Sequence, residues 1–495
     1  MKTNSLDFDA QALREKILDL AMRGKLVKQD PNDEPASVLL EKIKAEKEQL
    51  IKEKKIKKSK LLPPISDEEK PFEIPDSWEW VRLGDIGAWA AGATPSRKHP
   101  EYYGGTIPWL KTGDLNDGIV NETSEKITEL GVKNSSVKVN EPGNVLIAMY
   151  GATIGKLGIV GNQELVTNQA CCGCSLFDGV HNWYLFYYLL ASRKRLIDLG
   201  SGGAQPNISK NKIEKFTFPL PPLEEQSRIA AKIAQLFALL RKVESSTQQY
   251  AKLQTLLKSK VLDLAMRGKL IKQDPNDEPA SVLLEKIKAE KAELVKEKKI
   301  KKSKPLPEIT DDEKPFDIPD SWEWGRLGDI CLSNIGLTYK PSQKSEKPTK
   351  TIILRANNVE ANELNKENVI FLDIDNLKEK YYLKENDILM AVRSGSKRLV
   401  GKSAVVTPQF VGFSFGAFMS KIRILSANSW YVDYFLNSAA FRSQLGDANT
   451  TTINQITQGM INNFVLPLPP LSEQNRIAAK IAQLFALLRK DESSN

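Results

Sequence analysis

The side chains of this chain that could do chemistry are polar and basic residues in glycine-rich loops of two regions, residues 87–217 and 331–465. Arginine and lysine pair well with guanine, asparagine and glutamine pair with adenine, and serine, threonine and lysine suit phosphates. The loops therefore favour contacts with DNA, although polar loops are common on protein surfaces and their glycines also suit turns. The candidate DNA-binding residues are Thr94, Ser96, Arg97, Lys98, Lys111, Thr112, Tyr150, Thr153, Lys156, Asn207, Ser209 and Lys210 in the first region, and Tyr339, Lys340, Arg355, Asn357, Arg393, Ser394, Ser396, Lys397, Arg398, Thr452, Asn454 and Gln455 in the second.

Residues suited to catalysis are scarce. The two histidines, His99 and His181, lie far apart in the sequence, which leaves little material for a Ser-His-Asp triad or a metal–histidine site. The sequence has no GxxxxGK[ST] loop for ATP, and it has Leu-Pro-Pro where a DNA amino-methyltransferase would have an Asn/Asp-Pro-Pro-aromatic motif. We therefore expect no catalytic centre in this chain.

The cysteines predict no metal site. Cys171, Cys172 and Cys174 crowd together and Cys331 stands alone, whereas zinc needs two spaced pairs or additional histidines. They are interpreted as small buried residues in a reducing compartment. No apolar run reaches the roughly 18 residues of a membrane span, and the first residues lack the apolar core of a signal peptide. The sequence thus predicts a cytoplasmic protein that makes no membrane contact.

Length and composition predict several globular units. At 495 residues the chain is too long for one ordinary core, which suggests two to four units. A content of 41% hydrophobic and 27% charged residues is typical of globular proteins. The formal net charge of +9 permits a nucleic-acid partner without requiring one.

The chain repeats itself around two unlike inserts. Residues 18–60 match 262–304, and residues 220–242 match 468–490, almost letter for letter. The two regions between these matches, described above, barely resemble each other. Identical frames indicate one task performed twice, and unlike inserts indicate two different targets. The repeat order is circular, because the continuation of the last helical segment stands at the N-terminus. If the two chain ends meet, the molecule has approximate two-fold symmetry.

Apolar residues at alternating steps of four and three predict a long helix that ends at Gly268. A second helical seam begins near the C-terminus and resumes at the N-terminus. Two such helices would pack antiparallel and hold the inserts apart; the alternative is that they are core helices of one globular domain. The predicted seam residues are Ile229, Ile233, Leu236, Leu240, Val243, Leu257 and Val261 in the first helix, and Ile477, Ile481, Leu484 and Leu488 in the second.

The inserts read as mixed α/β, with strand candidates at 145–149, 157–160, 352–354, 388–392 and 403–406. The predicted fold class is α/β (α+β): two mixed α/β insert domains separated by two long antiparallel coiled-coil helices, with pseudo-two-fold symmetry. The predicted boundaries are 1–24 for the first part of the distal spacer helix, 25–79 for a helical arm and linker, 80–222 for the first insert domain, 223–268 for the central spacer helix, 269–323 for the repeated arm and linker, 324–470 for the second insert domain, and 471–495 for the C-terminal spacer helix.

Several motifs carry a family resemblance. PLPPLxEQxRI closes each insert at 219–229 and 467–477, and WEWVRLGDI (78–86) agrees with WEWGRLGDI (322–330). TPSRKHPEYYGGTIPWLKTGDL (94–115) and MYGATIGKLGIV (149–160) add to the pattern. In this combination, and over nearly its whole length, the chain resembles the specificity (S) subunit of a type I restriction–modification system.

The resemblance implies that each insert reads half of a bipartite DNA site and that an antiparallel coiled coil fixes the gap between the halves. Two methyltransferase (M) subunits would dock on the helical frame, bind S-adenosylmethionine and methylate adenine at N6. Two restriction (R) subunits would add ATP-driven translocation and Mg²⁺-dependent cleavage. The S subunit itself would have no active site and no cofactor of its own.

One departure is plain: the second insert lacks the GxTPS and IPWLKTGDL motifs of the first, so we expect no direct counterpart there for the first insert's residues. Two rival functions stay open. A DNA enzyme with an unfamiliar site predicts activity of the pure chain with Mg²⁺ or S-adenosylmethionine. A coiled-coil adaptor between two proteins predicts no sequence-specific DNA binding.

Overall fold

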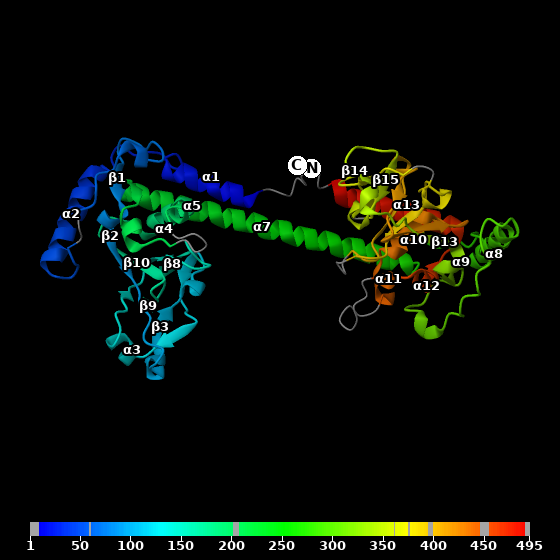
Figure 1. Ribbon diagram of the computed structural model, residues 1–495, viewed down its shortest axis with the longest axis horizontal. Coiled ribbons are helices and arrows are strands. Elements are labelled where there is room, and N and C mark those ends of the chain that lie inside the picture. Colours follow the sequence, from blue (N-terminus) through cyan, green and yellow to red (C-terminus); the bar gives the residue numbers. More distant parts are fainter. Residues whose placement is uncertain are drawn as a thin grey trace. The chain divides into compact units, whose positions relative to one another are not determined.

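A computed structural model describes residues 9–58, 61–200, 207–360, 362–374, 377–394, 399–445 and 455–490, with the side chains of residues 489 and 490 left aside. The described chain forms two compact units, one ending at Ser246 and the other beginning at Thr247. The helix α7 (Leu223–Met266, 44 residues) begins in the first unit and continues into the second (Figure 1). Within the described residues, no helix combines the length and apolar character that a membrane span needs.

The first unit is a mixed α/β structure. Its helices and strands are α1 (Ala10–Met22), α2 (Ala36–Lys52), β1 (Glu79–Arg82), β2 (Gly87–Ala91), β3 (Tyr103–Leu110), β4 (Gly118–Val120), β5 (Glu125–Ile127), α3 (Glu129–Lys133), β6 (Val139–Asn140), β7 (Val145–Ala148), β8 (Leu157–Val160), β9 (Leu165–Thr167), β10 (Cys171–Leu176), α4 (Asn182–Ala191), α5 (Arg193–Asp198), α6 (Lys210–Glu214), β11 (Thr217–Leu220) and the first part of α7.

The second unit is built in the same way. It contains the rest of α7, α8 (Ala280–Lys296), β12 (Glu323–Arg326), α9 (Leu327–Ile330), β13 (Cys331–Ile335), β14 (Lys344–Ser345), β15 (Thr351–Leu354), β16 (Val359–Glu360), β17 (Glu363–Leu364), β18 (Ile370–Leu372), β19 (Ile388–Ala391), β20 (Ser403–Val405), β21 (Ser414–Phe415), β22 (Met419–Ile424), α10 (Ser429–Leu436), α11 (Ala439–Gln444), α12 (Gln458–Asn463), β23 (Val465–Leu468) and α13 (Leu471–Lys490).

The two unlike inserts share one sheet topology. The order β2-β10-β7-β8 in the first insert, to which β4 adds an edge strand, corresponds to the order β13-β22-β19-β20 in the second. A second sheet, β5-β3-β9-β6 or β14-β18-β15-β21, contains one parallel pair in each insert, β3 with β9 and β15 with β21. Each insert is closed by an antiparallel pair of frame strands, β1 with β11 and β12 with β23. The predicted mixed α/β fold of the inserts is therefore confirmed, and the two share the order of their central strands despite their different sequences.

Within each unit, two frame helices run antiparallel. Figure 1 shows α1 lying along the first part of α7. Arg14 of α1 pairs with Glu244, late in this part of α7, while Gln29 beyond α1 bonds Glu225 near its start. In the second unit the Gln254 amide donates to the Leu488 carbonyl at 2.9 Å, and Gln273 bonds Glu473 at 2.7 Å. In both units, residues further along the first segment contact residues nearer the start of the second, which is the pattern of an antiparallel pair. Whether the two chain ends meet stays a prediction.

The predicted register of the helical seam is partly wrong. Ile229, Ile233, Ile477 and Ile481 are fully buried, and Leu236, Leu240, Val261, Leu484 and Leu488 are half-buried. By contrast, Val243 is 47% and Leu257 50% exposed. Phe237, Leu262 and Phe485 are buried instead. The buried residues of these helices follow one another at intervals of four, as at 229, 233 and 237. This spacing arises because each helix packs one apolar face, with a period of 3.6 residues, against the domain beside it. A strict heptad seam would have required a supercoiled partner along the whole length.

The PLPPLxEQxRI motif fixes where each spacer helix begins. Glu225 is 1% exposed and accepts hydrogen bonds from the Trp78 indole at 2.9 Å and the Gln29 amide at 2.5 Å. Gln226 accepts from the main-chain N–H of His181 at 2.8 Å, and Arg228 pairs with Asp33. The second unit repeats these contacts with Trp322 and Gln273 on Glu473, Asn428 on Gln474, and Asp277 on Arg476. The motif therefore joins helix, arm and insert at one point.

A buried arginine ties the linker to each insert. The Arg82 side chain is 5% exposed, and its guanidinium donates hydrogen bonds to both carboxylate oxygens of Glu69, at 2.7 and 2.9 Å. The same guanidinium donates to the carbonyls of Pro63, Pro64 and Lys215. Arg326 makes the corresponding contacts to Glu313 and to the carbonyls of Pro307, Glu308 and Asn463. We call these two sets of contacts the arginine clamps.

Acid is expected to weaken both clamps. The hydrogen bonds from Arg82 and Arg326 lower the pKa of Glu69 and Glu313 to about 2. A depressed carboxyl pKa adds stability that is complete above the unfolded value near 4.5 and is lost as the pH falls through about 2. Chemical unfolding of Glu69→Gln and Glu313→Gln should therefore show a stability deficit at pH 6 that shrinks toward pH 2. Glu68→Gln removes a neighbouring carboxylate that does not bond Arg82 and serves as the control. A deficit that is constant with pH would contradict the clamp.

Candidate nucleic-acid interface

In each insert, two of the predicted DNA-binding loops lie side by side. Tyr150, just after β7, forms an antiparallel bridge with Asn207, and the N–H of Ile208 donates to the carbonyl of Met149 at 2.8 Å. In the second insert, Arg393 after β19 forms the same bridge with Gln455. The sequence separates these loops by more than 50 residues, and the common topology brings them together.

A small polar cluster surrounds Tyr150. The Thr94 hydroxyl donates to the side-chain oxygen of the exposed Gln169, and Tyr150 bonds the same glutamine. Burial raises the pKa of Tyr150, so its hydroxyl keeps its proton and stays a donor. Gln169, which pairs well with adenine, was not predicted from the sequence. The side-chain bond to Thr94 is a long-range contact, and no local motif pointed to it.

Arg97 and Lys111 converge on one carboxylate. Arg97 lies 2.8 Å from one Glu125 oxygen and Lys111 2.8 Å from the other, and together they lower the pKa of Glu125. The Arg97 guanidinium also lies 4.1 Å from the centroid of the Tyr103 ring. The Arg97 side chain is still 57% exposed. Its position is therefore fixed by Glu125 and Tyr103 while one face stays open to a nucleic acid.

The second insert does have counterparts of the first insert's motifs, so our expectation was wrong. Lys111 follows β3, and its N–H bonds Asp114 at 2.8 Å; Arg355 follows β15, and its N–H bonds Asn358 at 2.9 Å. The sequence LKTGDL therefore corresponds to LRANNV. The two are equivalent because strand pairing places them at the end of the same parallel strand pair, a relation that residue identity did not reveal.

A glycine marks a second shared position. The N–H of Gly92 donates to Cys171 and that of Gly336 to Met419, both at 3.0 Å. A Cβ on Gly92 would overlap the carbonyl oxygen of Thr167, and one on Gly336 would overlap that of Gly416. Backbones approach too closely there for a side chain. The pair Gly92-Ala-Thr94 and Gly336-Leu-Thr338 is therefore one structural motif in both inserts.

Lys402 is the counterpart of Lys156 and was missed from the sequence. The N–H of Gly155 donates to Ala148 at 2.9 Å, and that of Gly401 donates to Ala391 at 2.8 Å. Both glycines have a positive φ, +77° and +82°, a backbone shape that favours glycine. A Gly-Lys pair directly before a buried strand is the signal that could have found Lys402. No ion pair holds either lysine within the described part of the chain.

Other predicted residues fall into three groups. Ser209 caps α6 by accepting from the Lys212 N–H, and Lys210 pairs with Glu214, so both have structural partners. Arg393 stacks 5.2 Å from the ring centroid of Phe418, an aromatic residue that is 54% exposed and was not predicted. The remaining described candidates are the exposed Ser96, Lys98, Lys340 and Asn357 and the half-buried Thr112, Thr153, Tyr339 and Ser394. Ser396, Lys397, Arg398, Thr452 and Asn454 lie outside the described residues.

Arg355 is the most constrained of the predicted basic residues in the second insert. Its Nη2 donates to the Asn368 carbonyl at 2.7 Å, and its Nε is buried with no hydrogen-bond partner in the described part of the chain. Gln455, by contrast, is exposed beside Arg393. The candidate surface of the second insert thus combines Arg355, held by a main-chain carbonyl, and Arg393, stacked on an aromatic ring.

The cysteines of this chain are buried and form no metal-binding cluster within the described ranges. The four cysteines are free and buried, and burial raises the pKa of Cys172 and Cys331 to about 12, so their thiols stay protonated. No cluster of three or more metal-ligating side chains occurs within those ranges. Free buried thiols are what the sequence predicted for the four cysteines.

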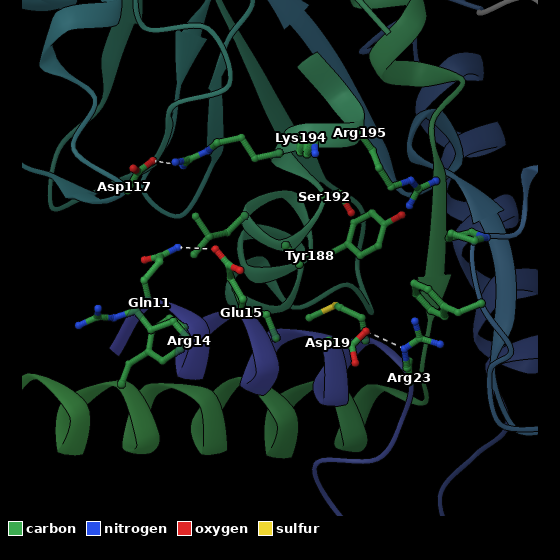
Figure 2. Close-up of a pocket in the computed structure, with 18 residues that line it drawn as sticks. Gln11, Arg14, Glu15, Asp19, Arg23, Asp117, Tyr188, Ser192, Lys194 and Arg195 are labelled. Carbon is green, nitrogen blue, oxygen red and sulfur yellow. Dashed lines mark hydrogen bonds and ion pairs between the residues drawn. The ribbon is translucent and has the colours of Figure 1, made fainter. Parts of the chain in front are cut away.

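A pocket of about 750 Å³ opens between α1, α4 and α5 of the first unit (Figure 2). Its charged walls are largely paired: Gln11 bonds Glu15, Asp19 bonds Arg23, and Asp117 pairs with Arg193. The Arg195 guanidinium lies 4.8 Å from the ring centroid of Phe216. We assign this pocket no chemistry.

Comparisons with known proteins agree with the motifs. The Type I restriction modification DNA specificity domain matches residues 75–254 and 319–494. The Escherichia coli type I restriction enzyme EcoAI specificity subunit is 34% identical, over 98% of this chain and 90% of that protein. The EcoEI specificity subunit, also of Escherichia coli, is 31% identical over 97% and 89%.

A solved structure from work on complex assembly and conformational transition of the type I R-M system has the same fold. It aligns with a TM-score of 0.56 at 21% identity and covers 86% of this chain and 94% of its own. Two copies of the family domain, placed on the two units described above, account for most of the sequence. The chain belongs to the family of type I restriction–modification DNA specificity subunits.

Proposed function

We propose that this chain is the sequence-specificity subunit of a type I restriction–modification complex and that each insert reads one half of a bipartite, asymmetric site in double-stranded DNA. One observation carries the proposal: the two inserts share the order of their central strands and the positions of the loops that follow them, yet present different side chains at those positions. Tyr150 and Lys111 in one correspond to Arg393 and Arg355 in the other. Equivalent positions with different donors and acceptors are what two readers of different sequences need.

The repeated frame has a different task. Two near-identical frames suit the docking of two copies of one methyltransferase subunit, which would bind S-adenosylmethionine and flip out an adenine for N6 methylation. Two motor–nuclease subunits would supply ATP- and Mg²⁺-dependent cleavage. The chain itself would be non-catalytic, and its partner subunits would supply the chemistry.

Mapping of N6-methyladenine across the host genome, with and without this gene, tests the proposal. We expect one bipartite motif to lose methylation on deletion and to regain it on complementation. If every methylated motif persists in the deletion strain while the partner genes are expressed, the proposal is wrong.

The paired lysines give a sharper test of DNA contact. Lys156→Ala and Lys402→Ala are each expected to weaken binding to all DNA sequences alike and to lower the slope of log K against log salt by about 0.9, the loss of one phosphate contact. Lys138→Ala, at an exposed position just before β6 that is not among the candidate DNA-binding residues, is the control. Titration of labelled duplex DNA at several salt concentrations measures the slope. An unchanged slope in both variants would remove these lysines from the interface.

A further inference from the structure

A polar cluster lies buried in the second unit where the first unit has apolar side chains. Asp433 of α10 is 1% exposed, and one of its oxygens accepts from the Ser403 hydroxyl at 2.6 Å. Asn437 donates to the same hydroxyl at 3.0 Å. Because Lys402 occupies the same structural position as Lys156, the next residue, Ser403, is the counterpart of Leu157 in the first unit.

The helices give the matching position for Asp433. Tyr431 and Tyr184 donate to the carbonyls of Pro467 and Pro219, at the same point of each frame. Asp433 lies two residues after Tyr431, and Phe186 lies two residues after Tyr184, so the two occupy matching positions. Phe186 is 2% exposed. The second unit thus has a hydroxyl and a carboxyl group at the two positions that Leu157 and Phe186 occupy in the first unit.

The second oxygen of Asp433 has no hydrogen-bond partner within the described ranges, and neither has the hydroxyl of Thr407. Both residues line a pocket of about 170 Å³ between the ends of β17 and β20 and the helices α10 and α13. None of the described residues that line this pocket is lysine or arginine. A buried carboxyl oxygen without a donor is costly, so a group outside this set is expected to satisfy it.

The pocket is too large for a single water, which takes about 30 Å³ of liquid volume. Its remaining walls are largely apolar and aromatic, including Leu364, Val405, Trp430 and Phe485. Trp430 is 38% exposed, so the pocket has an edge open to solvent. A carboxylate at the base and aromatic rings at the side match an organic cation, which gains from both.

We propose that this pocket binds an alkylammonium group, with Asp433 as its counter-ion, Thr407 as a hydrogen-bond acceptor, and Trp430 and Phe485 as its walls. The group could belong to a free amine or to the lysine side chain of a bound protein, because both present the same chemistry. The proposal does not depend on DNA reading.

Binding should depend on pH. Burial raises the pKa of Asp433 to about 7, and the bond from Ser403 offsets part of that rise. Glu363 and Tyr434 also line the pocket, and the Lys258 ammonium lies 5.9 Å from the ring centroid of Phe485. An ammonium ion binds the ionised carboxylate, so affinity should increase between pH 6 and pH 8.

Calorimetric titration of the full-length chain with n-butylammonium chloride at pH 8 tests the proposal. We expect saturable binding that 1-butanol and matched sodium chloride do not reproduce. Asp433→Asn should weaken it at least tenfold. The double variant Ser403→Leu with Asp433→Phe installs the apolar pair of the first unit, so it should fold normally and bind no amine.

Absence of saturable binding by the wild type, or equal binding by the double variant, would overturn the proposal. A second titration distinguishes the sources. If the full chain in complex with its protein partner no longer takes up n-butylammonium, and Asp433→Asn weakens that complex, the group is a partner lysine. If the complex still takes up the amine, the group is a free amine.

Discussion

A chain in which residues 87–215 replace residues 331–463 is expected to direct methylation to a site built from two copies of one half-site. The junctions are matched in the structure: Ile86 and Ile330 are both fully buried. The carbonyl of Phe216 accepts from Leu83 at 2.9 Å, and that of Phe464 accepts from Leu327 at 2.7 Å. The original asymmetric motif should lose its methylation entirely. The circular repeat order predicts that the two copies are inverted.

The reciprocal exchange is the control for this prediction. Residues 331–463 placed in the first frame should produce a site with two copies of the other half. Methylome sequencing of strains that carry each chimera reads both outcomes directly. If a folded chimera still methylates the original asymmetric motif, the inserts do not determine the half-sites.

Arg82→Met is expected to destabilise the first unit by about 3 kcal/mol, and Arg326→Met the second by a similar amount. Removing one partner of a buried ion pair costs about 3–5 kcal/mol, and the lower end applies because Glu69 is 43% exposed and keeps contact with water. The substitution also leaves the carbonyls of Pro63, Pro64 and Lys215 without this donor.

Two variants bracket this effect. Arg82→Lys keeps the charge but loses the bidentate geometry, so an intermediate loss is expected. Arg241→Met alters an exposed arginine of α7 and should change stability by less than about 0.5 kcal/mol. Urea unfolding, followed for each unit by its own tryptophans, measures the difference. A loss below about 1 kcal/mol in Arg82→Met would show that the clamp contributes little.

The helical frame could be predicted because the segments that form it occur twice in the sequence, almost unchanged. The two PLPPLxEQxRI copies, the ends of the long helix and the mixed α/β inserts all followed from matched segments and local patterns. The seam register did not follow, because Val243 and Leu257 fit a heptad yet lie on a face that neither neighbouring domain covers. Burial on a long helix depends on what packs beside it, which the helix's own sequence does not state.

The interface was only partly predictable for a related reason. Local composition located Tyr150 and Arg393, but the bridges to Asn207 and Gln455 depend on strand pairing across the insert. Lys402 and Arg355 became counterparts of Lys156 and Lys111 only once backbone hydrogen bonds aligned the inserts. Equivalence of position, not of residue type, relates the two readers.

Each unit completes its own core from helices that flank its insert: α1 with the first part of α7, and the last part of α7 with α13. The chain carries a long direct repeat, residues 18–60 and 262–304. A deletion between equivalent positions of the two copies would remove one insert together with one set of frame helices and leave a polypeptide of about half the length. That product would keep repeated frame segments on both sides of its remaining insert, so we expect it to form one core of this kind. A second insert would then have to come from another copy of the shorter chain.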